Sequence, residues 1–278
     1  MKVITTLGDM AEYILKLTHP MGLVPTMGSL HQGHLELINR SCSENVSTIV
    51  SIFVNPLQFL PNEDFDNYPR DLNRDLEILK KANVDTVFIP TVTEFYPSDF
   101  STYIDVEKFS KKLEGKSRPG HFRGVATVVG KLLILCRPDY AYFGQKDAQQ
   151  VLLIRQMNRD LNLGVSIVTV PTVRDVDGVA FSSRNKYLSN SERKAARVLY
   201  QSLLAVQEVK SNSVDDLKNV IFKTLTKEPL IQIDYVNISD PDTLEEISVV
   251  NKKCLVSIAV YVGKIRLIDN FLLDNMWR

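Results

Sequence analysis

The chain has 278 residues, of which 44% are hydrophobic and 24% are charged, a composition typical of a globular protein with one large domain or two ordinary ones. Lys plus Arg and Asp plus Glu both number 33, so the formal net charge is zero, which argues against a dedicated nucleic-acid-binding protein. The three cysteines form no CxxC pair and no apolar run is long enough for a signal peptide or a membrane span, so we expect a cytoplasmic protein without disulfides, thiol-held metal or membrane anchor.

Between residue 22 and about residue 170, short apolar runs alternate with longer segments of helical periodicity. This order predicts a parallel sheet covered by helices, and the apolar runs lack clean alternation, which suits strands buried on both faces. We therefore predict an α/β fold with a doubly wound parallel sheet in a Rossmann-like N-terminal domain. The expected strands are residues 23–25, 48–54, 86–89, 140–143 and 165–170, and the expected helices are residues 35–43, 72–82, 125–135 and 149–161.

The pattern changes after Asp177-Gly178. Ser189 and Glu192 have the spacing of a capping box that opens a helix towards Lys210, and a second helix is expected next. Three β-rich stretches follow, the last two joined by a tight turn, so we predict a smaller α+β C-terminal domain with antiparallel pairing. The expected second helix is residues 215–226, the expected strands are residues 231–238, 254–262 and 265–272, and the expected domains are residues 1–172 and 173–278.

The stretch 22–34 runs from an apolar strand through a Pro/Gly turn into a helix start that carries two histidines. Unpaired N–H groups and the helix dipole favour an anion there, and His31 and His34 project from one face. Gly28 and Gly33 allow a ligand close to the backbone. The spacing therefore indicates a phosphate site, with a metal pair or an ordinary strand-to-helix junction as the alternatives.

Other polar clusters follow the predicted strands, where ligands bind in open α/β sheets. Asn55 and Gln58 follow the second strand and suit an oxygen-rich substrate, although Asn55 in a turn can also cap its own backbone. Lys146 suits a phosphate and Asp147 a ribose diol, against the alternative of a solvated helix start. Ser182, Ser183 and Arg184 suit a polyphosphate, against the alternative of a domain linker. The basic, glycine-rich residues 115–124 are interpreted as a mobile flap.

Taken together, these motifs resemble the pantothenate synthetase (pantoate:beta-alanine ligase) family, within the nucleotidyltransferase superfamily that shares the HxGH motif. They span residues 25–185 and occur in the family's order. The motifs are Pro25-Thr26-Met27-Gly28 with His31-Gln32-Gly33-His34, Phe53-Val54-Asn55-Pro56-Leu57-Gln58-Phe59, Tyr68-Pro69-Arg70, Arg118-Pro119-Gly120-His121-Phe122, Phe143-Gly144-Gln145-Lys146-Asp147 and Ser182-Ser183-Arg184-Asn185.

The resemblance implies condensation of D-pantoate with beta-alanine through a pantoyl adenylate, with ATP cleaved to AMP and pyrophosphate and Mg2+ required. It also implies a homodimer and a C-terminal domain that closes over the active site. Positioning and charge stabilisation should then dominate the rate. Two other readings stay open: a nucleotidyltransferase that leaves AMP on a phosphorylated substrate, and a nucleotide-sensing module without turnover.

Roles carried over from the family fall on residues of these motifs. Asp71 and Asp75 flank Arg74, so no protein ligand is assigned to Mg2+, which ATP oxygens are expected to hold. Phe181 and Gln145 depart from the family's usual residues. The implied catalytic residues are His31, His34, Lys146, Ser182, Ser183 and Arg184, with His34 as proton donor. The implied ATP-binding residues are Met27, Gly28, Ser29, Leu30, Gln32, Gly33, Gly144, Gln145, Asp147, Val173 and Phe181, and the implied pantoate-binding residues are Gln58, Gln150 and Asn55.

Overall fold

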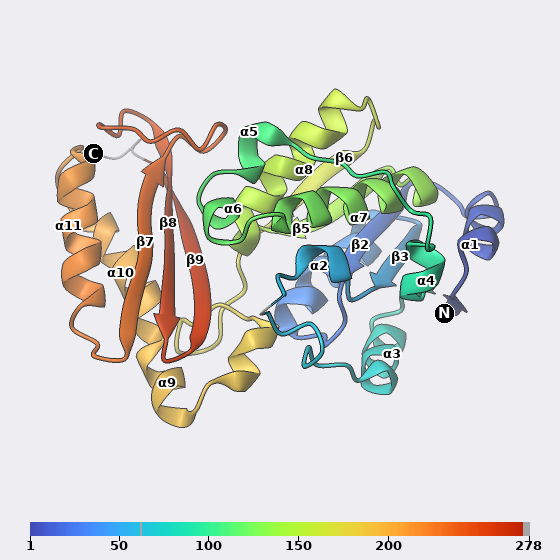
Figure 1. Cartoon of the computed structure of the whole chain (residues 1–278), viewed down its shortest axis with the longest axis horizontal. Helices are drawn as coiled ribbons and strands as arrows, with labels where there is room; N and C mark the ends of the chain where they lie inside the picture. Colours follow the sequence, from blue (N-terminus) through green and yellow to red (C-terminus); the bar gives the residue numbers. More distant parts are fainter. Residues whose placement is uncertain (62, 275–278) are drawn as a thin grey trace. The chain divides into compact units, whose positions relative to one another are not determined.

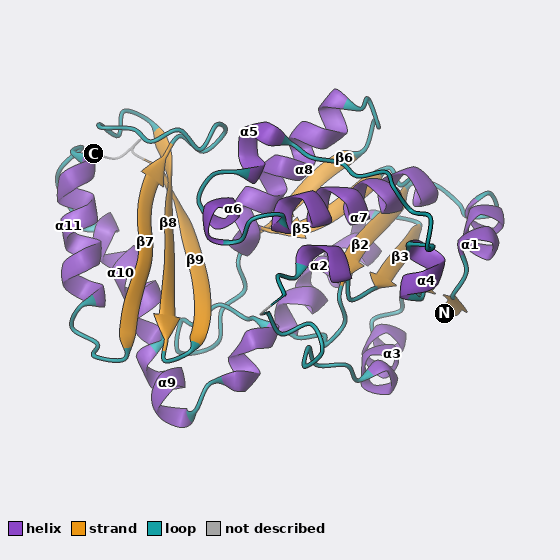
Figure 2. Ribbon diagram, viewed as in Figure 1, coloured by secondary structure: helices purple, strands orange, loops and turns teal. Residues whose placement is uncertain are grey.

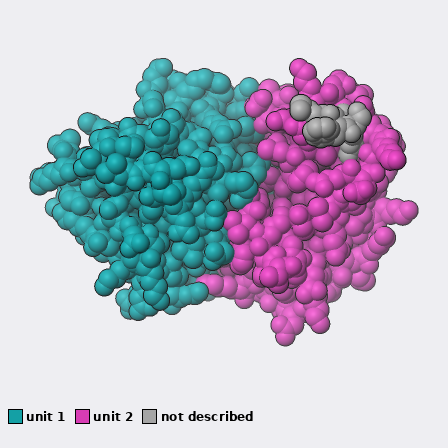
Figure 3. Space-filling model, turned by 180° about the vertical axis from the view of Figure 1, so that it is seen from behind, with its two compact units in different colours: residues 1–171 teal, residues 172–278 magenta. Residues whose placement is uncertain are grey.

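The computed structural model describes residues 1–61 and 63–274. The chain divides into two compact units, Met1–Pro171 and Thr172–Arg278, which are coloured separately in Figure 3. Each unit has its own sheet: six strands in the first and three in the second (Figure 2). Each unit is therefore described by itself.

The first unit is built on a parallel sheet with the strand order β1-β4-β3-β2-β5-β6. The predicted doubly wound α/β fold is confirmed. The order reverses between β2 and β5, which are neighbours although most of the unit separates them along the chain (Figure 1). The strands are β1 (Lys2–Ile4), β2 (Met21–Thr26), β3 (Ser47–Ile52), β4 (Thr86–Phe88), β5 (Tyr140–Gly144) and β6 (Ser166–Val170).

Helices cover both faces of this sheet. One face packs against α2 and α3 through a shared apolar cluster that includes Val24, Ile38 and Leu79. The α7 helix contacts β2, and α8 contacts β5 and β6. Because the sheet is covered on both faces, β3 is buried at every position, which explains why the apolar runs show no alternation. The helices are α1 (Leu7–Ile14), α2 (Gln32–Glu44), η1 (Pro56–Gln58), α3 (Leu72–Lys81), α4 (Val92–Phe95), α5 (Glu107–Ser110), α6 (Glu114–Ser117), α7 (His121–Cys136), η2 (Gln145–Asp147) and α8 (Ala148–Asp160).

The second unit is a small α+β structure, as predicted. Its sheet has the order β7-β8-β9 with antiparallel pairing, and its helices pack on the sheet through side chains such as Leu203, Ile221 and Ile258. The single helix expected towards Lys210 is wrong, because it is interrupted at Ala196 and ends at Gln207. The elements are η3 (Ser183–Tyr187), α9 (Asn190–Ala195), α10 (Arg197–Gln207), α11 (Val214–Leu225), β7 (Ile231–Ser239), β8 (Lys253–Val262) and β9 (Ile265–Asp274).

All three cysteines are free thiols. Cys136 and Cys254 are buried, and burial raises the pKa of the Cys136 thiol to about 12. Cys42 is half-buried, and burial likewise raises the pKa of its thiol. Neither Cys42 nor Cys136 is therefore an activated thiolate at neutral pH. Among the helices of the described residues, none is both long enough and apolar enough to cross a membrane.

Candidate active site

The carboxyl ends of β2 and β5 bring the first group of candidate residues together. These strands are neighbours at the point where the strand order reverses, which is where open α/β sheets bind ligands. The loop after β2 leads to His31 and His34 at the start of α2, and Lys146 follows β5. Lys146 is close enough that its positive charge contributes to lowering the pKa of His34. The structure therefore places both histidines and the lysine in one site.

Asp75, in the first turn of α3, holds the loop between β2 and α2 by hydrogen bonds. The Asp75 carboxylate is only 2% exposed and accepts hydrogen bonds from the backbone N–H groups of Ser29 (2.7 Å) and Leu30 (2.8 Å). Gly28 adopts a φ of 77°, and a Cβ there would lie 2.9 Å from Asp75 Oδ2. Asp75 therefore fixes the loop that presents the histidines, a role that the sequence analysis did not assign.

His31 and His34 form a stacked pair at the start of α2. Their ring centroids lie 3.9 Å apart with an interplanar angle of 20°, and the His31 backbone N–H donates to His34 Nδ1 at 3.4 Å. Burial, followed by the charges of His31 and Lys146, holds the pKa of His34 well below its ordinary value. Because Nδ1 accepts a hydrogen bond, the neutral ring carries its proton on Nε2. His34 is thus a neutral donor at physiological pH.

Backbone donors for an anion remain at the first turn of α2. Asp75 already takes the N–H groups of Ser29 and Leu30. The N–H groups of Gln32 and Gly33 donate to no residue that the structure describes. An anion bound at this helix start would therefore meet the donors at positions 32 and 33.

The amides after β3 form a hydrogen-bonded chain. Asn55 is 1% exposed and caps η1, its Oδ1 accepting from Leu57 N–H at 3.3 Å. Its Nδ2 donates to Gln58 Oε1 at 3.0 Å, and Gln58 Nε2 donates to Met27 Sδ at 3.1 Å. The structure thus brings Asn55, Gln58 and Met27 together. The hydrogen bond from Leu57 N–H matches the alternative in which Asn55 caps its own backbone. Gln58 lies nearer to the β2–α2 loop than Asn55 does.

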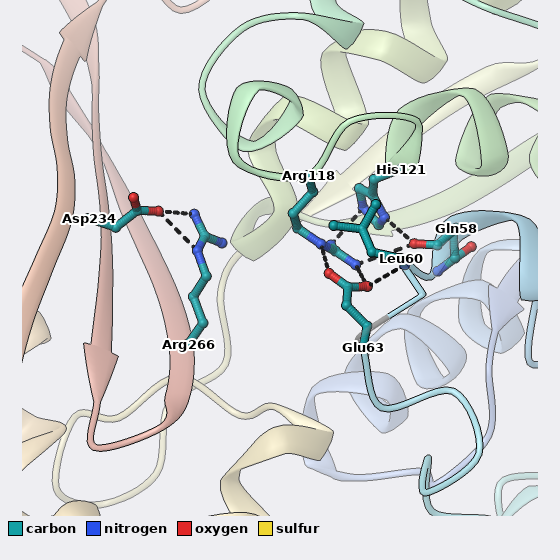
Figure 4. Close-up of polar contacts among 7 residues, drawn as sticks. All are labelled: Gln58, Leu60, Glu63, Arg118, His121, Asp234 and Arg266. Atoms are coloured by element: carbon teal, nitrogen blue, oxygen red, sulfur yellow. Dashed lines mark hydrogen bonds and ion pairs between the residues drawn. The ribbon is translucent and has the colours of Figure 1, made fainter.

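A partly buried ionic network holds the η1 loop to the start of α7 (Figure 4). Arg118 forms a two-pronged pair with Glu63 at 2.5 and 2.6 Å. His121 Nδ1 donates to the Gln58 carbonyl at 2.7 Å, and its Nε2 accepts from Arg118 at 3.0 Å. Burial, then the charge of Arg118, lowers the pKa of His121 to about 4, so its ring is neutral.

This network includes part of residues 115–124, whose mobility as a flap stays a prediction. In the structure they form α6 and the start of α7 rather than an open loop. Gly124 packs so closely that an added Cβ would lie 2.2 Å from the Leu57 carbonyl oxygen. The segment therefore acts as a support for Gln58, through packing as well as through Arg118 and His121.

The segment after β5 supplies the second group of site residues. Lys146 is largely buried and lies 3.5 Å from the half-exposed Asp147. A Cβ at Gly144 would meet nothing within 4 Å, so this backbone is open to a ligand. The Gln150 side chain makes no hydrogen bond within residues 1–61 and 63–274, whereas the Gln149 side chain is hydrogen-bonded to the backbone of residues 109–114. Of the two amides, Gln150 is thus the one available to a substrate.

The remaining candidates lie in the second unit. Val173 and Phe181 face each other across a hairpin, in which Phe181 N–H donates to the Val173 carbonyl at 3.1 Å. Ser182 caps η3 by accepting from Arg184 N–H at 3.3 Å, and Ser183 is buried. The Val173–Phe181 hairpin thus leads directly into the Ser-Ser-Arg motif.

Ion pairs within the second unit hold this hairpin. Arg193 and Arg197 both contact Asp177, at 2.8 and 3.0 Å. Burial opposes ionisation of Asp177, but hydrogen bonds from the two arginines outweigh it and lower its pKa. Arg174 pairs with the buried Asp269 of β9 at 2.6 Å. The hairpin is therefore a fixed element of the unit rather than the linker that composition alone allowed.

A further ion pair in this unit, drawn in Figure 4, joins two strands. Arg266 of β9 contacts Asp234 Oδ2 at 2.6 and 3.0 Å, and Asp234 lies at the irregularity in β7. Within the described residues, no group of three His, Cys, Asp or Glu side chains is arranged to hold a metal ion.

Sequence reasoning missed the residues that position this site rather than those that face it. Asp75 and the Glu63–Arg118 pair contact partners far away in the chain, as does Tyr96, whose hydroxyl donates to Asn55 Oδ1. No local spacing signals such pairs. Asp75 was noticed only as one carboxylate near a basic residue. Its place at the start of an amphipathic helix offered the only hint, since the first turn of a parallel-sheet helix can approach a neighbouring strand end.

Comparison with known proteins gives one consistent family. A family model described as Pantoate-beta-alanine ligase matches residues 2–272. The pantothenate synthetase of Thermosipho africanus (strain TCF52B) is 52% identical, over 98% of this chain and 100% of the relative. That of Roseiflexus sp. (strain RS-1) is 51% identical over 99% of this chain and 100% of the relative.

Solved structures agree with these relatives. The pantothenate synthetase of Thermus thermophilus has a TM-score of 0.94 at 45% identity, covering 98% of this chain and 99% of that one. The pantoate-beta-alanine ligase of Francisella tularensis, complexed with beta-gamma ATP and beta-alanine, has a TM-score of 0.81 at 37% identity, covering 98% and 97%. Fold and sequence are thus shared over the whole length.

Proposed function

The chain belongs to the pantoate-beta-alanine ligase family, and we propose that it condenses D-pantoate with beta-alanine through a pantoyl adenylate. A carboxylate is a poor electrophile, so its oxygen first attacks the α-phosphorus of ATP, and pyrophosphate leaves. The amine of beta-alanine then attacks the acyl carbon, AMP leaves with the electron pair, and the nitrogen loses a proton. The ligand-bound structure of the Francisella tularensis enzyme supports ATP and beta-alanine as substrates.

The observation that carries this proposal is the convergence of His31, His34 and Lys146 where the strand order reverses. Neutral His34 donates from Nε2 to a phosphate oxygen, and Lys146 neutralises charge that moves onto the leaving pyrophosphate. The open N–H groups of Gln32 and Gly33 add uncharged donors at the same helix start. These groups are held before the substrate arrives, so no reorganisation is needed during the reaction.

We propose that Gln58 and Gln150 bind pantoate, with Asn55 behind Gln58. Both are neutral amides near the carboxyl end of the sheet. An amide can orient the pantoate oxygens without the tight ion pair that would reduce the nucleophilicity of the carboxylate. Beta-alanine would then enter on the side of the acyl carbon once pyrophosphate has left.

The nucleotide completes the proposed site. Gly144 and Asp147 hold the ribose, while Met27, Val173 and Phe181 line the adenine. Ser182, Ser183 and Arg184 bind the triphosphate. The other ATP contacts proposed are Gly28, Ser29, Leu30 and Gln145.

The proposals for the metal ion and for the oligomeric state rest on the family and not on the geometry of the site. Mg2+ accompanies ATP and is held by its phosphate oxygens, and no step relies on a protein ligand for it. We propose a homodimer in the cytoplasm. Sedimentation of the purified protein would measure its assembly directly.

The experiment that tests the function is AMP and pyrophosphate release from ATP and Mg2+ with D-pantoate, with and without beta-alanine. Turnover that requires both organic substrates, with pantoyl adenylate accumulating when the amine is omitted, supports the proposal. The His34→Ala protein should lose adenylate formation. ATP binding without release of AMP in either condition would refute the ligase reading and favour a nucleotide sensor.

A further inference from the structure

The orientation of the Asn55 amide is fixed by backbone groups. Oδ1 accepts from Leu57 N–H, which can only donate, and Nδ2 donates to the Gly124 carbonyl at 3.1 Å, which can only accept. Rotating the amide by half a turn would place its NH2 group against the Leu57 N–H and its oxygen against the Gly124 carbonyl. Since the side chain is 1% exposed, no water replaces the lost partners.

The fixed Asn55 amide in turn orients Gln58. Its second N–H is aimed at Gln58, so the Gln58 oxygen must face Asn55, at 3.0 Å. The Gln58 NH2 group then points away from Asn55 and towards the β2–α2 loop, where it contacts Met27 Sδ. A thioether sulfur is a weak acceptor, so a substrate oxygen can displace it at little cost.

Tyr96 completes the arrangement from the other side. Its hydroxyl donates to Asn55 Oδ1 at 2.9 Å, and burial raises its pKa, so the phenol stays protonated. The ring is held in an aromatic group with Phe53 and Phe100, and Lys131 lies 5.4 Å from its centroid. Lys131 also donates to the Phe95 carbonyl at 2.7 Å. The phenol therefore reaches Asn55 from a rigid support.

We propose that Tyr96 and Asn55 are positioning residues that fix the orientation of the Gln58 amide, so that its NH2 group can only donate to the substrate. This orientation selects a substrate oxygen that can accept the hydrogen bond. The inference rests on the proposed function, because the substrate oxygen is taken to be pantoate's. Asn55 then acts through Gln58 and does not touch pantoate. The same chain of contacts explains why Asn55 lies beside the site although its side-chain oxygen and NH2 group are already hydrogen-bonded within the protein.

The test is a double-mutant cycle with steady-state kinetics of AMP release. Asn55→Asp keeps the shape but places a second acceptor against the Gly124 carbonyl and Gln58 Oε1, which turns the Gln58 amide and presents its oxygen to the substrate. We expect KM for D-pantoate to rise about a hundredfold, with KM for ATP within about twofold of wild type. Tyr96→Phe should raise KM for D-pantoate about tenfold.

The decisive variant is Asn55→Asp combined with Gln58→Ala. If Asn55 acts through Gln58, adding Asn55→Asp to Gln58→Ala changes KM for D-pantoate by less than about threefold. Effects that multiply would overturn the proposal, as would wild-type kinetics for Tyr96→Phe. The matched control is Tyr103→Phe, because the Tyr103 hydroxyl donates to no residue that the structure describes, and its kinetics should not change.

Two further results keep the test separate from the proposed function. Should Asn55→Asp fail to fold, Tyr96→Phe alone carries the test, since its change is confined to one hydroxyl. A wild-type protein that releases AMP without pantoate would refute the proposed function, whatever the variants do. A wild-type protein that requires pantoate, together with independent effects of Asn55 and Gln58, would refute only the positioning role.

Discussion

Replacing Asp75 with asparagine should detach the loop that presents His31 and His34. The carboxylate accepts two backbone N–H groups, at 2.7 and 2.8 Å, in a site where it is 2% exposed. A carboxamide has one acceptor oxygen, so one N–H would face an NH2 group instead. Losing a hydrogen bond to a charged group and leaving a buried donor unpaired should together lower the free energy of unfolding by about 2–4 kcal/mol.

The catalytic effect should exceed what this loss of stability alone would cause. A displaced loop misplaces two histidines at once, and errors of about 1 Å in a positioned group cost on the order of a hundredfold in rate. We therefore expect kcat/KM for ATP to fall about a hundredfold in adenylate formation, measured at a temperature where the variant is folded.

Two other variants bracket this result. Asp71→Asn is the matched control, because Asp71 caps the same helix at its exposed start and asparagine caps equally well, so neither stability nor rate should change. Gly28→Ala perturbs the same contact from the loop side, where a Cβ would lie 2.9 Å from Asp75 Oδ2. Wild-type kinetics for Asp75→Asn, or a loss of stability with unchanged kcat/KM, would refute the positioning argument.

Three more predictions follow from the site. The pKa of His121 is lowered to about 4, so as the pH falls from about 6.5 to about 4 the unfolded chain gains a proton at this residue that the folded chain does not take up. His121 should therefore contribute a loss of stability of up to about 3 kcal/mol over this range, and urea unfolding of His121→Gln should show a correspondingly smaller slope, with the contribution of His34 remaining. Lys146→Ala should lose most of the adenylate-forming half-reaction and keep its circular dichroism spectrum; normal turnover or an unfolded protein would contradict this. Gly124→Ala should raise KM for D-pantoate and lower the melting temperature, because its Cβ would lie 2.2 Å from the Leu57 carbonyl oxygen and displace Gln58; unchanged pantoate kinetics would count against the support role of α7.

Sequence patterns predicted the main elements because their signals are local. Strand β3 is buried throughout and appears as one apolar run, and α3 shows helical periodicity within a residue of its observed bounds. The strand β1 was missed because two of its three residues are exposed, so it forms no apolar run, and its place is defined by its pairing with β4. Pairing between distant segments leaves no periodic trace in either.

The residues of the site likewise divide into those with a local sequence signal and those without one. The HxGH stretch could be interpreted alone, since strand, turn and helix start lie within one short segment. The contacts that hold it could not, because Asp75 lies 46 residues from Ser29 and Glu63 lies 55 residues from Arg118. Burial makes these pairs decisive, and burial is known only once the sheet and its helices are assembled.

The buried thiols make this chain suitable for site-specific labelling. Cys136 and Cys254 are inaccessible and the pKa values of the Cys42 and Cys136 thiols are raised, so the native cysteines should react slowly with maleimides. New cysteines at Leu15 and Val176, which are 77% and 105% exposed, would then take spin labels selectively. The distance between two such labels could then be recorded with and without ATP and pantoate.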